Sequence, residues 1–244
     1  MSKSLKLDFI VKSYDTYPNG KLSMPSLLDF LQETAGIHAI KLNFGMEELS
    51  ARNETWVLSR MRVEIDRWPE RGEAIVVETW PKGVDRLFAV RDFLVYDKKG
   101  EIVARSSSYW LLVNKETKRP KPFESYISDQ LKSDRSGIDQ RLGKLPNLKT
   151  IDYSDKRKSM YSEIDENWHV NNVKYTEWII DAMPYEILEE RILSSYEINY
   201  LSEIKIGESI EIELGWEEDD RNNLLGNVKK DDKLSCQVKM VFDN

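Results

Sequence analysis

Two segments far apart in the sequence share one pattern of apolar residues. Residues 63–80 read VEIDRWPERGEAIVVETW, and residues 196–216 read YEINYLSEIKIGESIEIELGW. When Gly72 is placed on Gly207, apolar residues on both sides of the glycine coincide at alternate positions. Alternation of this kind predicts two strands joined by a turn. A chain that repeats the pattern is expected to fold as two copies of one unit.

A helical pattern precedes each copy. In the first half, Ser23 is a candidate cap, Pro25 falls in the first turn, and a set of residues shares one helix face: Leu27, Leu31, Thr34, Ala35 and His38. In the second half, Asn171 or Asn172 can cap a helix with its own shared face: Tyr175, Trp178, Ile179 and Ala182. Strand-like segments follow in both halves, at 86–97, 101–114, 224–230 and 233–242.

This order predicts an α+β protein in which each repeat is one long helix wrapped by a curved antiparallel sheet, an arrangement called the hot-dog fold. Other α+β folds share the same order, so periodicity alone does not decide between them. We expect an N-terminal repeat at 1–120, a polar connector over the surface at 121–150, and a C-terminal repeat at 151–244.

Composition narrows the class of protein. Hydrophobic residues make up 40% of the 244 residues and charged residues 32%, which is typical of globular proteins. There is no apolar run of the roughly 20 residues that span a membrane, and no signal-peptide pattern. The single cysteine, Cys236, excludes an internal disulfide and suits a reducing cytoplasm. Two histidines leave little material for a metal site, and a net charge of −7 argues against a general nucleic-acid binder.

The segment most suggestive of chemistry is EIDENWHVNNVKYTEWIID, residues 163–181. Asp165, Asn167 and His169 stand at alternate positions, so an extended segment would place them on one face. The helix that follows would point its free N–H groups toward that face and stabilise an oxyanion. Asn171 and Asn172 would cap the helix and position a substrate carbonyl. Capping alone explains one or two such residues, but this cluster is larger.

The same segment resembles the diagnostic motif of the acyl-acyl-carrier-protein (acyl-ACP) thioesterases, Asp-x-Asn-x-His-Val-Asn-Asn-x-Lys-Tyr. The matching positions are Asp165, Asn167, His169, Val170, Asn171, Asn172, Lys174 and Tyr175. The segments 31–39, 56–73, 90–95 and 106–120 are similar to that family's first repeat, so the likeness covers about residues 5–215. It implies a tandem hot-dog fold and hydrolysis of fatty acyl-ACP thioesters without a cofactor or metal.

The resemblance also implies a catalytic glutamate, Glu203, on a strand of the second repeat. The family commonly has a cysteine next, where this chain has Ile204. A Cys–His–Asn mechanism is therefore not available from that position, and Cys236 is expected to be a small buried hydrophobe. We expect Asp165 or Glu203 to act as general base or transient nucleophile, His169 to orient or shuttle the proton, and Asn167 to hold the carbonyl or the imidazole.

The first half lacks this set, since YDTYPNGKLSMPS (14–26) occupies the equivalent stretch. We expect it to supply the acyl-chain pocket, with Trp56, Met61 and the aromatic residues near Trp110 as candidate lining residues, and we interpret His38 as a core histidine. An acidic carrier protein suits a basic patch. The candidates are Lys115, Lys118, Arg119 and Lys121 in one cluster, and Lys156, Arg157 and Lys158 in another.

Two other function classes stay open at this point. One is a hot-dog hydratase or dehydratase acting on acyl thioesters, and the other is a non-catalytic acyl-binding protein. The expected partner is acyl carrier protein, with no nucleic acid and no membrane span. The expected location is the bacterial cytoplasm, and assembly into a homodimer is left open.

Overall fold

The computed structural model describes residues 3–123, 133–218 and 220–243. The chain divides into two compact units, residues 1–142 and 143–244. The division falls inside the connector that the sequence indicates at 121–150.

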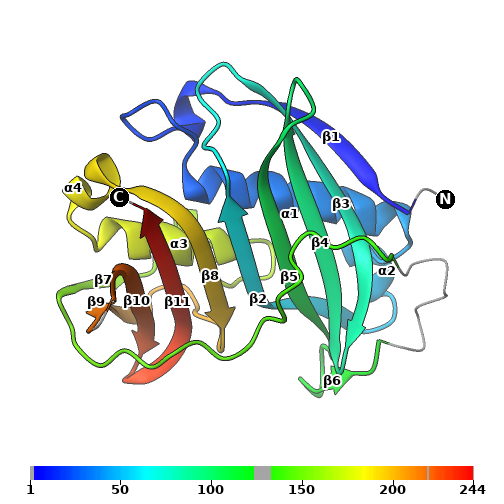
Figure 1. Cartoon of the computed structure of the whole chain (residues 1–244). Coiled ribbons are helices and arrows are strands. Elements are labelled where there is room, and N and C mark those ends of the chain that lie inside the picture. The colour runs from blue at the N-terminus through cyan, green and yellow to red at the C-terminus, as the bar shows by residue number, and fades with distance from the viewer. Residues whose placement is uncertain (1–2, 124–132, 219, 244) are drawn as a thin grey trace. The chain divides into compact units, whose positions relative to one another are not determined.

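The described residues of the first unit form two α-helices, a short 3-10 helix at Ser13–Asp15 and an antiparallel sheet (Figure 1). Its elements are β1 (Leu5–Ile10), α1 (Met24–Lys41), α2 (Met46–Ser50), β2 (Glu54–Ile65), β3 (Ala74–Asp85), β4 (Phe88–Asp97), β5 (Ile102–Asn114) and β6 (Pro120–Lys121). The strand order is β1-β3-β4-β5-β2, and β6 pairs with β5.

The second unit repeats this arrangement. Its elements are β7 (Tyr153–Lys158), α3 (Asn172–Asp181), α4 (Tyr185–Glu190), β8 (Ile192–Tyr200), β9 (Ser209–Glu217), β10 (Asp220–Lys230) and β11 (Lys233–Asp243). The strand order, β7-β9-β10-β11-β8, corresponds strand for strand to that of the first unit. The predicted duplication of one α+β unit is therefore confirmed.

The alignment of Gly72 with Gly207 holds at the level of individual hydrogen bonds. In the first unit, the Gly72 amide donates to the Val11 carbonyl, and the Val11 amide donates to the Glu73 carbonyl. In the second unit, the Gly207 amide donates to the Ser159 carbonyl, and the Ser159 amide donates to the Glu208 carbonyl. Both glycines have a positive φ, +85° and +75°, which L side chains rarely adopt.

Each long helix buries one face against its own sheet. The Ser23 hydroxyl caps α1 by accepting from the Ser26 amide, and Pro25 lies in the first turn. The predicted face is buried: Leu27, Leu31, Thr34, Ala35 and His38. Helix α1 packs on β1 and β3, and α3 packs on β9 and β10. In α3, Asn171 is the cap, and the buried face includes Tyr175, Trp178 and Ile179.

Residues 133–142 lie on the other face of the first sheet. Thr79 and Arg91 face α1, since Arg91 contacts both Thr79 and His38 of that helix. The neighbouring positions along these strands face the opposite way. There Glu78 binds Arg135, and Asp92 accepts from the Gly137 amide at 2.7 Å. This segment therefore forms part of the first unit.

Candidate active site

Residues 164–170 of the second unit form a closed loop. Ile164 and Val170 pair as an isolated antiparallel bridge, and the Asp165 amide donates to the His169 carbonyl at 2.8 Å. Between them the chain turns, and Trp168 has φ +63°. The prediction of an extended segment is wrong at this point, because Asp-x-Asn favours a turn closed by side-chain-to-backbone bonds.

The Asp165 carboxylate is engaged in holding this turn. Its Oδ1 accepts from the amides of Asn167 at 2.8 Å and of His169 at 3.4 Å. Its Oδ2 contacts the Asn167 side-chain amide at 3.5 Å. Asn167 itself is exposed at the loop tip. The structure therefore gives both residues a role in shaping the loop that presents His169.

His169 meets the second carboxylate of the predicted set. Its Nε2 lies 3.0 Å from Oε2 of Glu203, with the imidazole 24% exposed and the carboxylate 52% exposed. An imidazole that donates from Nε2 carries its lone pair on Nδ1. The pair is reachable from solvent and can move a proton. It is the contact between sequence-predicted residues most suited to acid–base chemistry.

Glu203 lies after a strand rather than on one. Strand β8 ends at Tyr200 and β9 begins at Ser209, so the expected strand position is wrong. The intervening segment is tied to the histidine loop because the Val170 amide donates to the Ile204 carbonyl at 2.9 Å. Val170 follows His169 and Ile204 follows Glu203, so this bond brings the two side chains together.

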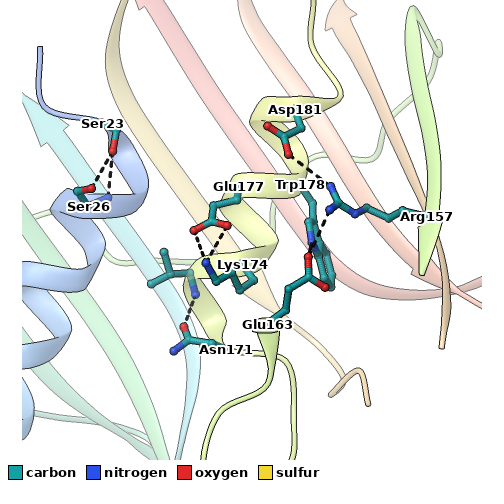
Figure 2. Close-up of polar contacts among 10 residues, drawn as sticks. Ser23, Ser26, Arg157, Glu163, Asn171, Lys174, Glu177, Trp178 and Asp181 are labelled. Atoms are coloured by element: carbon teal, nitrogen blue, oxygen red, sulfur yellow. Dashed lines mark hydrogen bonds and ion pairs between the residues drawn. The ribbon is translucent and has the colours of Figure 1, made fainter. Parts of the chain in front are cut away.

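The loop ends at the N-terminus of α3 (Figure 2). The Asn171 side chain accepts from the Val173 amide at 2.9 Å, as a helix cap does. Asn172 is the first residue of the helix, and its carbonyl accepts from the Tyr200 hydroxyl at 3.0 Å. The positive end of the α3 dipole thus lies directly after His169 in the chain.

A buried glutamate that the sequence reasoning missed anchors the loop. The Glu163 carboxylate accepts from the Met160 amide at 2.7 Å, from the Trp178 indole at 2.8 Å and from Arg157 at 3.3 Å. Figure 2 marks with dashed lines the bonds of Glu163 to Trp178 and Arg157. Its own carbonyl accepts from the Asn171 amide, which closes the loop. The sequence did hold a signal for Glu163, because the first repeat has another carboxylate, Asp15, at the equivalent position.

The first unit contains the same loop without the His169–Glu203 pair. There the Tyr17 amide donates to Lys21, the Gly20 amide donates to Tyr17, and the Leu22 amide donates to Pro69. When the two loops are aligned by these bonds, Lys21 takes the place of His169. Trp68, just before Pro69, takes the place of Glu203. The first unit therefore has the backbone of the site but neither the imidazole nor the carboxylate.

Cys236 is enclosed by the second unit. It lies on β11 opposite Tyr200 and is fully buried. Burial raises the pKa of its thiol well above the ordinary value, so the thiol stays protonated. Cys236 is thus the buried hydrophobe that the sequence predicts.

The expected pocket residues lie in the first unit. Met61 and His38 are buried, and the Trp56 ring packs edge-on against Phe123. The Trp110 indole donates to Ser108. A pocket formed by Trp56, Met61 and Trp110 stays a prediction.

The first basic cluster is partly engaged in local contacts. Lys115 donates to the Ser50 hydroxyl at 2.8 Å, and Lys121 lies 2.7 Å from the buried carboxylate of Glu54. Lys118 has a positive φ in the turn between β5 and β6, and Arg119 lies beside it.

The second basic cluster lies on β7. Lys156 and Lys158 are exposed, while Arg157 faces inward to Glu163. The ammonium of Lys156 is 3.0 Å from Glu211, and this carboxylate raises the Lys156 pKa. A shallow groove beside these residues is lined by both signs of charge, since it includes Lys229, Glu211, Asp231 and Asp232.

Two further classes of feature do not occur in the described ranges. Residues 3–123, 133–218 and 220–243 contain no group of three or more His, Cys, Asp or Glu side chains placed to hold a metal ion. Nor does any helix within these ranges have the length and apolar character needed to cross a membrane.

Comparison with known proteins identifies the family. Residues 2–131 match the acyl-ACP thioesterase N-terminal domain, and residues 149–244 match the acyl-ACP thioesterase C-terminal domain. A chloroplastic palmitoyl-acyl carrier protein thioesterase of Gossypium hirsutum is 31% identical over 210 residues, which cover 80% of this chain and 51% of that protein. The chain thus spans about half the length of the curated relatives it matches.

Solved structures agree along the whole chain. An acyl-ACP thioesterase from Bacteroides thetaiotaomicron superposes with a TM-score of 0.87 at 30% identity and covers 100% of both chains. The 12:0-ACP thioesterase from Umbellularia californica gives 0.88 at 26% identity, covering 100% of this chain and 98% of that one. The predicted tandem hot-dog fold is confirmed, and the chain belongs to the acyl-ACP thioesterase family.

Proposed function

We propose that this chain hydrolyses the thioester of fatty acyl-acyl carrier protein and releases a free fatty acid and the carrier thiol. The observation that carries the proposal is the 3.0 Å contact between His169 and Glu203 at the end of a loop that leads into α3. A carboxylate beside an imidazole supplies the proton transfers of acyl transfer to water. The family membership of the chain supports the substrate class.

In the proposed reaction, the oxygen of a water molecule attacks the thioester carbonyl carbon. Glu203 takes a proton from that water, directly or through His169. The carbonyl oxygen becomes an oxyanion, which the N-terminal end of α3 stabilises. When the carbon–sulfur bond breaks, the departing sulfur receives the proton from the His169–Glu203 pair. Water thus supplies the acid oxygen, and its protons balance the products.

Glu203 is the better candidate for the base because the Asp165 oxygens already accept bonds from loop amides. Asp165 and Asn167 are then positioning residues that keep the loop closed. Asn171 contributes by capping α3, and Asn172 offers the first amide of the helix to the substrate carbonyl.

Thiol release from dodecanoyl- and palmitoyl-carrier protein, and from the corresponding CoA thioesters, tests the proposal. Glu203→Gln and His169→Ala should lower turnover by at least about a hundredfold, the usual scale for a lost acid–base group, while the circular dichroism spectrum stays unchanged. Lys21→Ala is the matched control, because Lys21 occupies the place of His169 in the first unit. Full release by both site variants would reject the roles of His169 and Glu203. No thiol release by folded wild type would reject the proposed hydrolysis. Hydration of a crotonyl thioester would then indicate a hydratase.

The proposed partner is acyl carrier protein, with the basic side chains of β7 as its docking surface. One feature supports β7 over the first cluster: the exposed Lys156 and Lys158 lie on the unit that carries His169. A bacterial cytoplasmic location is also part of the proposal, and homodimer formation stays a prediction from the sequence.

A further inference from the structure

Tyr175 contacts the main chain on both sides of Glu203. It lies in the first turns of α3, and its side chain is buried. Its hydroxyl accepts from the Ile204 amide at 3.1 Å and reaches the Ser202 carbonyl at 3.5 Å. These two groups belong to the peptides that flank Glu203, so one side-chain oxygen fixes the backbone that carries the carboxylate.

This connection matters because regular strand pairing does not hold Glu203. The segment between Tyr200 and Ser209 lies outside β8 and β9. On the side of β10 and β11, the Ser202 hydroxyl bonds to the Ser235 hydroxyl, and the Glu203 carbonyl accepts from Lys230 at 3.2 Å. On the side of the histidine loop, the bonds come from Tyr175 and from the Val170 amide.

The tyrosine ring itself is held firmly. It packs against Trp178 with centroids 5.3 Å apart and edge-on against Tyr200 at 5.5 Å. Burial raises the pKa of the Tyr175 hydroxyl, so the group stays neutral and can both donate and accept. A neutral hydroxyl on a fixed ring can accept from the Ile204 amide and donate to the Ser202 carbonyl at the same time.

The first unit supplies an internal comparison. When Lys21 is aligned with His169, Leu27 aligns with Tyr175, and leucine has no hydroxyl. Pro69 takes the place of Ile204 and has no amide hydrogen. Both partners of the hydrogen bond are therefore absent from the repeat that lacks the imidazole and the carboxylate. The repeat with the His169–Glu203 pair has both.

We infer that Tyr175 is a positioning residue that holds Glu203 against His169, and that its hydroxyl is needed for turnover rather than for binding. The inference rests on the proposed function of the pair. A displacement of a reacting group by about 1 Å can lower a rate by about a hundredfold. Loss of one of several bonds to the segment should have a smaller effect, about tenfold or more in kcat.

The experiment measures kcat and KM for thiol release, with the better of the two carrier substrates, in four variants. These are Tyr175→Phe, Glu203→Gln, the double variant and Tyr196→Phe. Tyr196 is the matched control because its buried hydroxyl also bonds to α3, through Thr176 at 2.8 Å. We expect Tyr175→Phe to lower kcat about tenfold or more with KM within about twofold, Tyr196→Phe to change neither, and Tyr175→Phe to add no loss once Glu203 is Gln.

The outcomes separate the two proposals. If Glu203→Gln destroys turnover while Tyr175→Phe keeps wild-type kcat, the inference is wrong and the proposed function stands. If Tyr175→Phe lowers the residual rate of Glu203→Gln by the same factor as in wild type, Tyr175 acts independently of Glu203 and the inference is again wrong. If Glu203→Gln retains full turnover, hydrolysis stands but Glu203 is not its base, and the inference is wrong. If folded wild type releases no thiol, the proposed function itself fails. Should Tyr175→Phe not fold, Ile204→Pro removes the same bond from the other partner and must reproduce the kcat loss.

Discussion

The buried carboxylate of Glu78 should make the stability of the first unit depend on pH. It accepts two hydrogen bonds from Arg135, both at 2.9 Å, and one from the Tyr96 hydroxyl at 2.9 Å. The Arg135 guanidinium also stacks over Trp80 at 4.2 Å. These contacts attach residues 133–142 to β3.

The magnitude follows from the pKa of Glu78. Hydrogen bonds from Arg135 lower it from 4.5 to about 2, against the opposing effect of burial. Each pKa unit corresponds to about 1.4 kcal/mol, which gives about 3 kcal/mol as an upper value. Arg135 is 49% exposed, and water screens the pair. We therefore expect Glu78→Gln to lower the free energy of unfolding by about 2 kcal/mol at neutral pH.

The sign of the pH dependence is fixed by the direction of the shift. A lowered native pKa stabilises the fold above the unfolded value of 4.5, and this stabilisation is lost as pH falls toward 2. The difference in the free energy of unfolding between wild type and Glu78→Gln, measured with urea, should therefore be smaller at about pH 3 than near neutral pH. Asp85→Asn is the control, since its ion pair with Arg141 is exposed and should contribute about 0.5 kcal/mol. A Glu78→Gln variant as stable as wild type near neutral pH, or equally destabilised at both, would refute this reasoning.

Three further outcomes are expected. Gly20→Ala should lower the free energy of unfolding by about 1 kcal/mol in thermal or urea unfolding, because φ is +80° and no atom lies near enough to stabilise the added methyl; unchanged stability would contradict this. The Cys236 thiol should react with a thiol reagent only after denaturation, since burial raises its pKa, and Cys236→Ala should keep thiol release; rapid labelling of native protein would contradict it. Lys156→Glu with Lys158→Glu should weaken thiol release from acyl-carrier substrate more than from acyl-CoA; equal losses would exclude docking on β7.

Much of the fold could be predicted from the sequence because alternation and helical spacing are local signals. The apolar alternation around Gly72 and Gly207 gave the correct alignment of the two units, down to matching hydrogen bonds. The helix faces were also predictable, since Leu27, Leu31 and His38 are spaced for burial and the structure buries them.

The site was harder to predict from the sequence because its geometry depends on turn chemistry and on contacts between distant residues. Alternating Asp165, Asn167 and His169 fit an extended segment as well as a loop, and the bonds of Asp165 to nearby amides decide for the loop. Local pattern could not reveal that Ile204 and Val170 share a hydrogen bond, nor that the Tyr175 hydroxyl reaches both sides of Glu203.

The matching loops at 16–22 and 164–170 share one main-chain framework but carry different side chains. Their closure rests mainly on main-chain bonds, which most residue types can form. The bonds are the same in both loops although Lys21 stands in place of His169 and Trp68 in place of Glu203. The loop can therefore keep its main-chain shape while the side chains at these few positions differ. Duplication followed by divergence therefore needs no new architecture, and one copy is free to specialise while the other preserves the shape.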